Sequence, residues 1–451
     1  MKSTTSSEDG NRLEKTGLRW PERLLGPVPG LKEINLVCWG FFLLCLLPVV
    51  VAVVYAQFTT AGVLHADFVN HYGVGKLFNE YPASQLYNFD LQRKVFGGIF
   101  PVQKGLYGPS PYPPFVAETF SLFARLSFER AYFLWMGISL ILYLAGIGAV
   151  VATFFPRQRL KASLFFCFAL ASRAFLMDTL INGQLSSVAV FAAGLAISLD
   201  RRSKPLLSGL ALAILIYKPT LIIILLPMLL LTRRFRTLAG FLGGSAFLLL
   251  ASTTYAGIGV WSAYPQMLNF YGVKSGFSGT SSFLLWMYVD LNSFSYAIPG
   301  GRTTAGLAIL ACIILCVAVC LALLLWKSAR SGVAAQSLAW AATLTWTLVL
   351  NVYVPRYDSI LVALSLILTL AALEALGWRQ AWRRMVFLAL MVFAATWVTP
   401  EIAQSYKVQI LTIVLFVLGV AQLILLRAAI RREPTLILGP VHTTPASPEL
   451  L

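Results

Sequence analysis

One acid has the position and the neighbours that chemistry near a membrane would need. Asp67 follows the first long apolar run, residues 36–57, within the stretch "LHADFVNHYGVGKLF". If this stretch is helical from His65 to Phe78, then Asn70 and His71 share the face of Asp67. A carboxylate there could take a proton from a hydroxyl that attacks a sugar carbon, which is work that Asp and Glu commonly do.

The same acid also has a structural interpretation. Aspartate is favourable at the start of a helix, where its charge complements the positive end of the helix dipole. The spacing alone favours this interpretation. Catalysis by Asp67 therefore needs support from other parts of the chain.

Four cations provide such support, because they abut apolar segments on the side of the membrane that the positive-inside rule leaves poor in cations. They are Arg173, Lys218, Arg302 and Arg356. Arg holds phosphate oxygens through two parallel hydrogen bonds, and Lys acts as a point charge. Together they predict an anion clamp that stabilises the charge on a departing lipid phosphate. Each one alone is also explained by snorkelling to lipid headgroups, and "VPRYDS" also allows a local ion pair between Arg356 and Asp358.

Amide and hydroxyl groups open another apolar segment, at "NGQLSS", residues 182–187. Gln184 could recognise sugar hydroxyls, although this segment alone favours a helix cap. Metal chemistry has weak support: beyond Asp67 and His71, spacing fixes no third ligand, and the remaining histidines are His65 and His442. The sequence predicts neither a metal nor a cofactor, and it lacks triad, phosphate-loop and dinucleotide motifs.

The composition of the 451 residues indicates what must position these groups. The chain is 58% hydrophobic and only 12% charged, far more apolar than soluble proteins. Continuous apolar runs predict an all-α polytopic membrane protein. Its six cysteines lie in these runs without a disulfide or zinc pattern, and Cys312, Cys316 and Cys320 share one face that small-residue packing would explain.

The distribution of positive charge sets the topology. A net charge of +17 could indicate nucleic acid, but the cations gather in short loops as the positive-inside rule requires, so the bilayer is the partner instead. Twelve spans satisfy this pattern and place both termini in the cytoplasm. They are residues 36–57, 132–155, 161–178, 184–199, 205–217, 219–232, 238–257, 303–326, 334–352, 358–376, 385–399 and 408–427.

The segments outside the membrane are unequal in length. The longest, residues 58–130, contains the helix-breaking "YGPSPYPPF" and then a short apolar stretch, 115–126, which predicts juxtamembrane helices. A second spans residues 258–302. Residues 1–35 and 428–451 form cytoplasmic tails too short for a soluble domain. Function is therefore expected at the outer face of the membrane domain, residues 36–427.

Several motifs together resemble a known family. "ADFVNHYGVGKLFNEYPASQLYNFD", "YPPF", "NGQLS" and "GLALAILIYKPTLIIILLPMLLLTRR" are similar, in order and spacing, to the polyprenyl-phosphate-dependent mannosyltransferases of glycosyltransferase family 87, in the GT-C superfamily. The resemblance covers roughly residues 60–235. It implies a GT-C fold in the cytoplasmic membrane and transfer of a hexose or pentose from a polyprenyl phosphate to an envelope glycan or glycolipid outside the membrane.

The resemblance also implies roles for individual residues. Asp67 matches the family's acid, the general base of a metal-independent, inverting displacement. Lys218 and Gln184 match donor contacts, while Asn70 and His71 are expected to contact the acceptor or the first loop. The C-terminal half departs from some relatives because it has no histidine on the outer side, which leaves the acceptor open.

Two other functions remain open from the sequence. Twelve spans would also suit a transporter or lipid flippase, although ionisable residues near the middle of the membrane, which coupling requires, are almost absent. A noncatalytic partner in glycan assembly is the third alternative.

Overall fold

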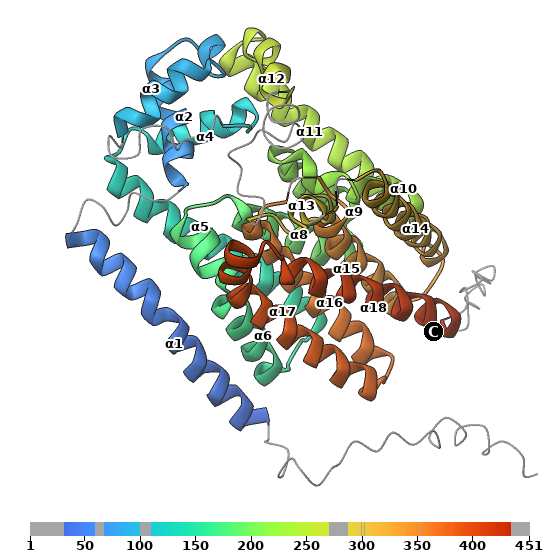
Figure 1. The fold of residues 1–451 in the computed structure, drawn as a ribbon. Coiled ribbons are helices and arrows are strands. Elements are labelled where there is room, and N and C mark those ends of the chain that lie inside the picture. Colours follow the sequence, from blue (N-terminus) through green and yellow to red (C-terminus); the bar gives the residue numbers. More distant parts are fainter. Residues whose placement is uncertain are drawn as a thin grey trace, which may run out of the picture.

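The computed structural model describes residues 31–58, 67–99, 110–269 and 287–433, apart from residues 299, 302 and 353 (Figure 1). These residues are helices joined by turns and irregular segments, and their only β contact is an isolated antiparallel bridge between Tyr288 and Pro355. The all-α prediction is therefore confirmed. The predicted N-terminal tail lies almost entirely outside the described residues, as do His65, His442 and Arg302.

The helices fall into three consecutive groups. The first contains α1 (Leu31–Phe58), α2 (Phe68–Glu80), the short η2 (Ala83–Gln85), α3 (Phe89–Ile99) and α4 (Pro114–Phe123). The second contains α5 (Phe128–Phe154), α6 (Arg159–Ala171), α7 (Arg173–Phe175), η4 (Leu176–Ile181), α8 (Ser186–Arg201), α9 (Pro205–Ala213), η5 (Ile214–Tyr217), η6 (Pro219–Ile222), α10 (Leu225–Leu231) and α11 (Phe235–Ala256). The third contains α12 (Gly259–Asn269), α13 (Leu291–Ala297), α14 (Thr304–Ser328), α15 (Val333–Val349), η9 (Arg356–Leu361), α16 (Val362–Ala375), α17 (Arg379–Tyr406) and α18 (Ile410–Arg432).

Six helices of the described chain are long and apolar enough to cross a membrane, or seven if the pair bent by 54° at Arg159–Ala171 and Arg173–Ile181 is one span. A multi-pass membrane protein is thus supported. All twelve predicted segments overlap helices, but some, such as the 17-residue α15, are short. The count of twelve stays a prediction.

Close packing of helices holds the bundle together around α8. A Cβ atom built on Gly146 of α5 would lie 2.5 Å from the carbonyl oxygen of Val190 in α8. Only glycine permits this approach, which is how helices commonly pack inside membranes. Helix α8 is therefore clamped against α5, and the turn that precedes it is held in place.

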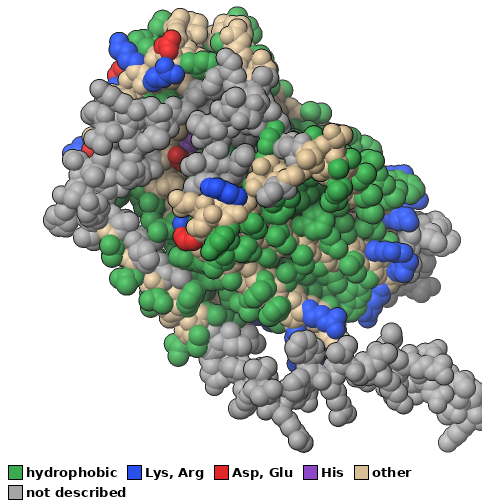
Figure 2. Space-filling model, viewed as in Figure 1, with side chains coloured by type: hydrophobic (Ala, Val, Ile, Leu, Met, Phe, Trp, Pro, Cys, Tyr) green, Lys and Arg blue, Asp and Glu red, His purple; other side chains and the backbone are tan. Residues whose placement is uncertain are grey.

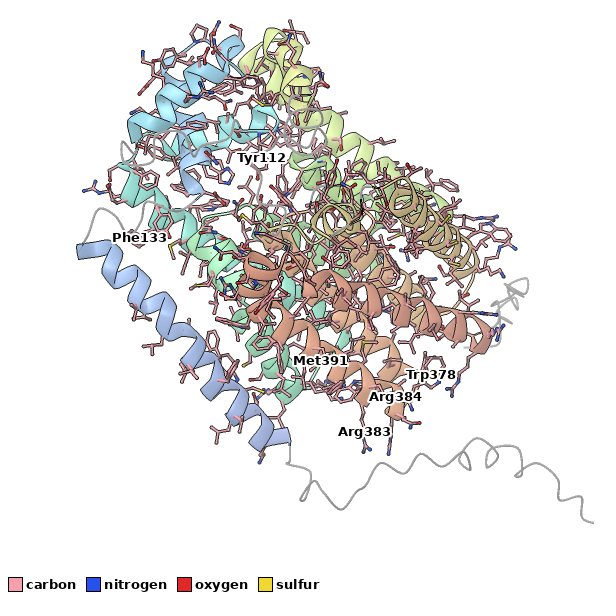
Figure 3. The ribbon with its side chains drawn as sticks, viewed as in Figure 1. Tyr112, Phe133, Trp378, Arg383, Arg384 and Met391 are labelled. Atoms are coloured by element: carbon pink, nitrogen blue, oxygen red, sulfur yellow. The ribbon has the colours of Figure 1, made fainter. Side chains whose placement is uncertain are left out.

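The two ends of α8 differ in chemistry. Ser186 and Arg201, at the two ends of this 16-residue helix, are separated by about 22 Å along its axis. In Figure 3, Tyr112 lies toward the α2–α4 end of the molecule, whereas Arg383 and Arg384 project from the opposite end. Figure 2 shows Lys and Arg side chains along the lower right edge of a broad hydrophobic face. The basic loops thus lie away from the "NGQLSS" turn, as the charge pattern predicts.

Helix α14 has an unusually exposed surface. It has a mean hydropathy of 3.3 in its most apolar window, of which only 6% is buried. Cys312, Cys316 and Cys320 are exposed along it. The prediction that small-residue packing within the chain explains these cysteines is wrong, because they face outward where lipid would lie.

Helices α2, α3 and α4 occupy the described part of residues 58–130. Asn79 of α2 donates to the carbonyl oxygen of Ser121 in α4 at 2.9 Å, and Gly75 packs against the backbone of Phe120. The predicted short apolar helix is confirmed as α4. The predicted helix around Asp67 is confirmed as α2, which begins at Phe68.

Candidate functional site

A sharp turn before α8 forms the base of the site. Gly183 adopts a φ of +68°, a conformation that glycine reaches without strain. A Cβ atom here would lie 2.6 Å from the Cβ atom of Phe68. Phe68 donates its backbone N–H to the carbonyl oxygen of Asn182 at 2.9 Å, and Trp135 donates to that of Gly183 at 2.9 Å. The start of α2 is thereby fixed against the turn.

This arrangement brings together two residues that are 117 positions apart. Gln184 donates from Nε2 to Oδ2 of Asp67 at 2.5 Å. Asp67 immediately precedes α2, yet its side chain makes no capping hydrogen bond. Burial raises the pKa of Asp67, the Gln184 hydrogen bond opposes this, and nearby Asp178 adds to it. The carboxylate therefore faces the "NGQLSS" turn and does not serve as a helix cap.

His71 lies one turn further along α2 and is only 1% exposed. Its ring stacks on Phe120 and contacts Tyr112, each with a centroid separation of 5.2 Å. Burial lowers the pKa of His71 to about 3; Gln184 opposes the shift and Lys218 adds to it. The ring is therefore neutral near pH 7. Oδ1 of neighbouring Asn70 is also buried, with no hydrogen-bond partner among the described residues.

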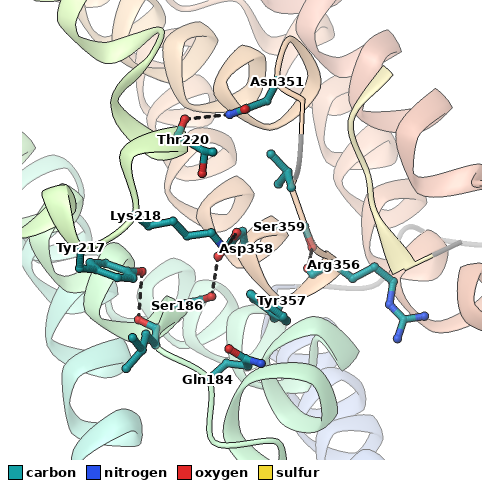
Figure 4. A network of polar contacts seen from close by, with 12 residues as sticks. Gln184, Ser186, Tyr217, Lys218, Thr220, Asn351, Arg356, Tyr357, Asp358 and Ser359 are labelled. Atoms are coloured by element: carbon teal, nitrogen blue, oxygen red, sulfur yellow. Dashed lines mark hydrogen bonds and ion pairs between the residues drawn. The ribbon is translucent and has the colours of Figure 1, made fainter. Parts of the chain in front are cut away.

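Lys218 reaches the site from the turn between η5 and η6. Its ammonium pairs with Asp358 of η9, a carboxylate that also accepts from the Ser186 hydroxyl at 2.7 Å (Figure 4). The Lys218 Nζ lies 4.7 Å from the centroid of the Tyr357 ring. Tyr357 is within electrostatic reach of Asp67 as well as Asp358. The cation and the Asp67 carboxylate thus belong to one polar region.

The pairing of Arg356 differs from the sequence-based alternative. Arg356 donates from its guanidinium to Asp178 at 3.1 Å, while in Figure 4 it points away from Asp358. The local Arg356–Asp358 pair is therefore wrong, because η9 directs successive side chains to different partners. Arg173 pairs with Glu401 of α17 at 2.7 Å, at a more exposed position.

The structure thus brings Asp67, His71, Gln184 and Lys218 into one region and places Arg356 beside it through Asp178. Arg302 lies outside the described residues. Sequence reasoning missed the parts played by Asp178, Ser186 and Tyr357. Asp178 had a signal, since it lies in the same short turn as Asn182, but its partner Arg356 is 178 residues away.

The residues allow acid–base chemistry beside two cations that could hold an anion. Asp67 can accept a proton, Gln184 can hold its carboxylate, and Lys218 and Arg356 are cations whose present partners are carboxylates. Asp67 and His71 are four residues apart at the start of α2, so both could bind the same metal ion. However, no group of three or more His, Cys, Asp or Glu within the described ranges is arranged to hold a metal ion.

Comparison with known proteins identifies one family. The model of glycosyltransferase family 87 matches residues 111–355, which is more than half of the chain and includes Gln184 and Lys218. No curated protein matches, and no solved structure matches.

Proposed function

The chain belongs to glycosyltransferase family 87, and we propose that it transfers a sugar from a polyprenyl-phosphate donor to an envelope glycan or glycolipid acceptor. The sugar is mannose or a related hexose or pentose. The observation that carries the proposal is the contact of Asp67 with Gln184 beside the paired cation Lys218. A base and a phosphate-binding cation are the two groups that this displacement needs most.

In the proposed reaction, Asp67 takes the proton of the acceptor hydroxyl as its oxygen attacks the anomeric carbon. The new carbon–oxygen bond forms on the face opposite the leaving group, so the configuration inverts. The bond from the anomeric carbon to the phosphate oxygen breaks, and its electron pair leaves with the polyprenyl phosphate. No metal or cofactor takes part in this scheme.

The cations would hold the phosphate as its charge grows. Lys218 and Arg356 are the central contacts, because both are nearly buried and both lie close to the turn that holds Asp67. Arg173 lies further out, and Arg302 is proposed as a fourth contact. Gln184 would contact the donor from the opposite side, and Asn70 and His71 would face the acceptor.

The position of the site in the membrane is also part of the proposal. Helix α8 separates the site from the basic loops, which the positive-inside rule assigns to the cytoplasm. We therefore place the site outside the cytoplasmic membrane, both termini inside, and residues 58–130 outside. Twelve crossings, counting the shorter helices, are consistent with this arrangement.

A transfer assay tests the proposal directly. The purified protein in lipid nanodiscs, supplied with radiolabelled polyprenyl-phosphate mannose and membrane lipid extract, is expected to form a labelled glycolipid. Asp67→Asn should abolish the product. Asp90→Asn, which changes an exposed acid of α3, serves as the matched control and should leave it unchanged.

Two results would contradict the proposal. One is full turnover by Asp67→Asn at normal expression. The other is flux of a lipid or solute across proteoliposomes without any transfer of sugar, which would indicate a transporter or flippase.

A further inference from the structure

The amide of Gln184 connects Asp67 to His71, a residue that the proposed reaction leaves without a defined chemical task. Its Nε2 atom donates to Asp67, so its Oε1 atom, on the other arm of the planar amide, is directed away from that carboxylate. Oε1 is buried and has no well-aligned hydrogen-bond donor among the described residues. Both ring nitrogens of His71 are also buried, and neither has a hydrogen-bond partner among the described residues. Because Gln184 contacts Asp67 and His71 follows Asp67 by one turn of α2, a buried acceptor and a buried donor lie in the same small region.

Gln184 affects the pKa of His71, because it opposes the lowering that burial causes. Gln184 favours the protonated form of the ring, which is the effect of an acceptor oxygen and not of an amide N–H. The ring itself is held by Phe120 and Tyr112, so it has little freedom to turn elsewhere. A neutral imidazole always carries one N–H donor.

The orientation of the amide matters for Asp67. An amide N–H directed at a carboxylate stabilises the ionised form, whereas an amide oxygen in the same place repels it and favours the protonated acid. The two ends of a glutamine amide are nearly equal in size, so packing alone does not choose between them. A fixed donor on the far side does choose.

We propose that His71 is a positioning residue that donates its ring N–H to Oε1 of Gln184 and thereby holds the amide N–H on Asp67. The inference rests on the proposed function, in which Asp67 is the base. His71 acts on Asp67 only through Gln184. This role is separate from the position of His71 toward the acceptor.

Other charged groups face the same residues and must be considered. Asp178 of η4 acts on Asp67, Lys218 acts on His71, and Tyr357 of η9 lies within reach of Asp67. None of them contacts Oε1 of Gln184 by a hydrogen bond in the described chain. Substitution of His71 alone therefore frees the amide to rotate while leaving these charges in place.

The test is the dependence of kcat/KM on pH for four proteins: the unmodified enzyme, His71→Phe, Gln184→Leu and the double variant. His71→Phe keeps a ring between Phe120 and Tyr112 but removes the donor. The pH at which kcat/KM falls on the acidic side of the profile, its acidic limb, should rise by about one unit, since Asp67 loses a hydrogen bond to its charged form. Gln184→Leu should move it by a similar amount, and the double variant should move it no further.

Two more variants complete the design. His71→Gln restores an N–H donor and should return the limb toward that of the unmodified enzyme. Tyr72→Phe removes a different, partly buried hydrogen bond of α2, to the carbonyl oxygen of Leu126, and should leave the limb unchanged. Size-exclusion chromatography and the melting temperature identify any variant that has not folded.

The outcomes are distinct. An unmodified protein that transfers no sugar overturns the proposed function and this inference with it. Transfer that depends on Asp67, but with the same limb in His71→Phe, overturns the inference alone. Additive shifts in the double variant also overturn it, because His71 would then act independently of Gln184.

Discussion

Two ionic clusters lie at opposite ends of α8 and differ in how fully their polar atoms are paired. The basic-end cluster consists of Asp200, Arg234, Gln336 and Trp340. Arg234 pairs with Asp200 and stacks 5.5 Å from the Trp340 ring, and Trp340 donates to the same carboxylate at 3.2 Å. A cavity of about 170 Å³ lies beside it. None of its side-chain polar atoms is buried without a partner within the described chain.

The site cluster, formed by Asp67, His71, Gln184, Lys218 and Asp358, is different. It also contains a buried ion pair, but the His71 nitrogens and Oε1 of Gln184 lack well-aligned partners in the described ranges. Buried polar groups in folded proteins are nearly always satisfied, and exceptions often have a functional reason. The unsatisfied polar atoms thus distinguish the site cluster from the basic-end cluster, which an ion pair alone does not.

The same substitution at each end should give opposite results. Asp67→Asn should lower transfer by roughly 10²- to 10⁴-fold, the usual contribution of a general base, without loss of thermal stability. Asp200→Asn should instead lower the melting temperature, because it weakens the partly buried pair with Arg234. Activity per folded molecule should stay within about twofold. Transfer rates and melting curves in one detergent check both; equal loss of activity at the two ends would break the comparison.

Removing the ion pair of the site cluster as a unit sharpens the comparison. Lys218→Met with Asp358→Asn avoids leaving an unpaired buried charge, so the fold should persist. The kcat/KM for the donor should still fall by about 10- to 100-fold, because a charge-assisted contact with phosphate is lost. Lys161→Met, which breaks a pair with Glu374 at the other end of the bundle, is the control. Unchanged kinetics in the double variant would remove Lys218 from the site.

The site cluster, and not the basic-end cluster, should set the pH dependence of transfer through Asp67. Because burial raises the pKa of Asp67, the base becomes protonated at a higher pH than an ordinary aspartate. Activity should fall about tenfold per pH unit below that pKa. Stability should change in the other direction: the raised pKa favours folding at low pH, and this contribution is lost as the pH rises through the folded-state pKa. Rate and melting profiles between pH 4 and 8 test both signs.

The smallest effect is expected at the rim of the site. Arg173 pairs with Glu401, whose side chain is 64% exposed, so solvent screens the interaction. Arg173→Ala should raise the KM for the donor by only about threefold and leave the melting temperature nearly unchanged. Steady-state kinetics measure this, and a loss above tenfold would move Arg173 from the rim to the centre of the proposed phosphate contacts.

Local signals in the sequence predicted more of the fold than of the site. Apolar runs and basic loops located the helices, because both patterns are local. They did not separate a full crossing from a short or bent helix, since a break such as that between α6 and η4 depends on packing with other helices.

The sequence was limited in the same way at the site: it predicted individual residues but not the contacts between them. Asp67, Gln184 and Lys218 were predicted, but their contacts join segments more than 100 residues apart. Asp178 and Ser186 were missed as partners because the residues they contact, Arg356 and Asp358, lie more than 170 positions away in the sequence. Only the packing of α5, α8 and η9 decides which carboxylate meets which cation.

The exposed cysteines of α14 also allow the depth of this helix in the bilayer to be measured. Cys312, Cys316 and Cys320 are spaced one turn apart, so their thiols lie in steps of about 6 Å along the helix axis. Alkylation by a membrane-impermeant maleimide should be slow at all three and graded from one to the next. A lipid-soluble reagent should label them in the opposite order, which would locate the hydrocarbon boundary without any engineered residue.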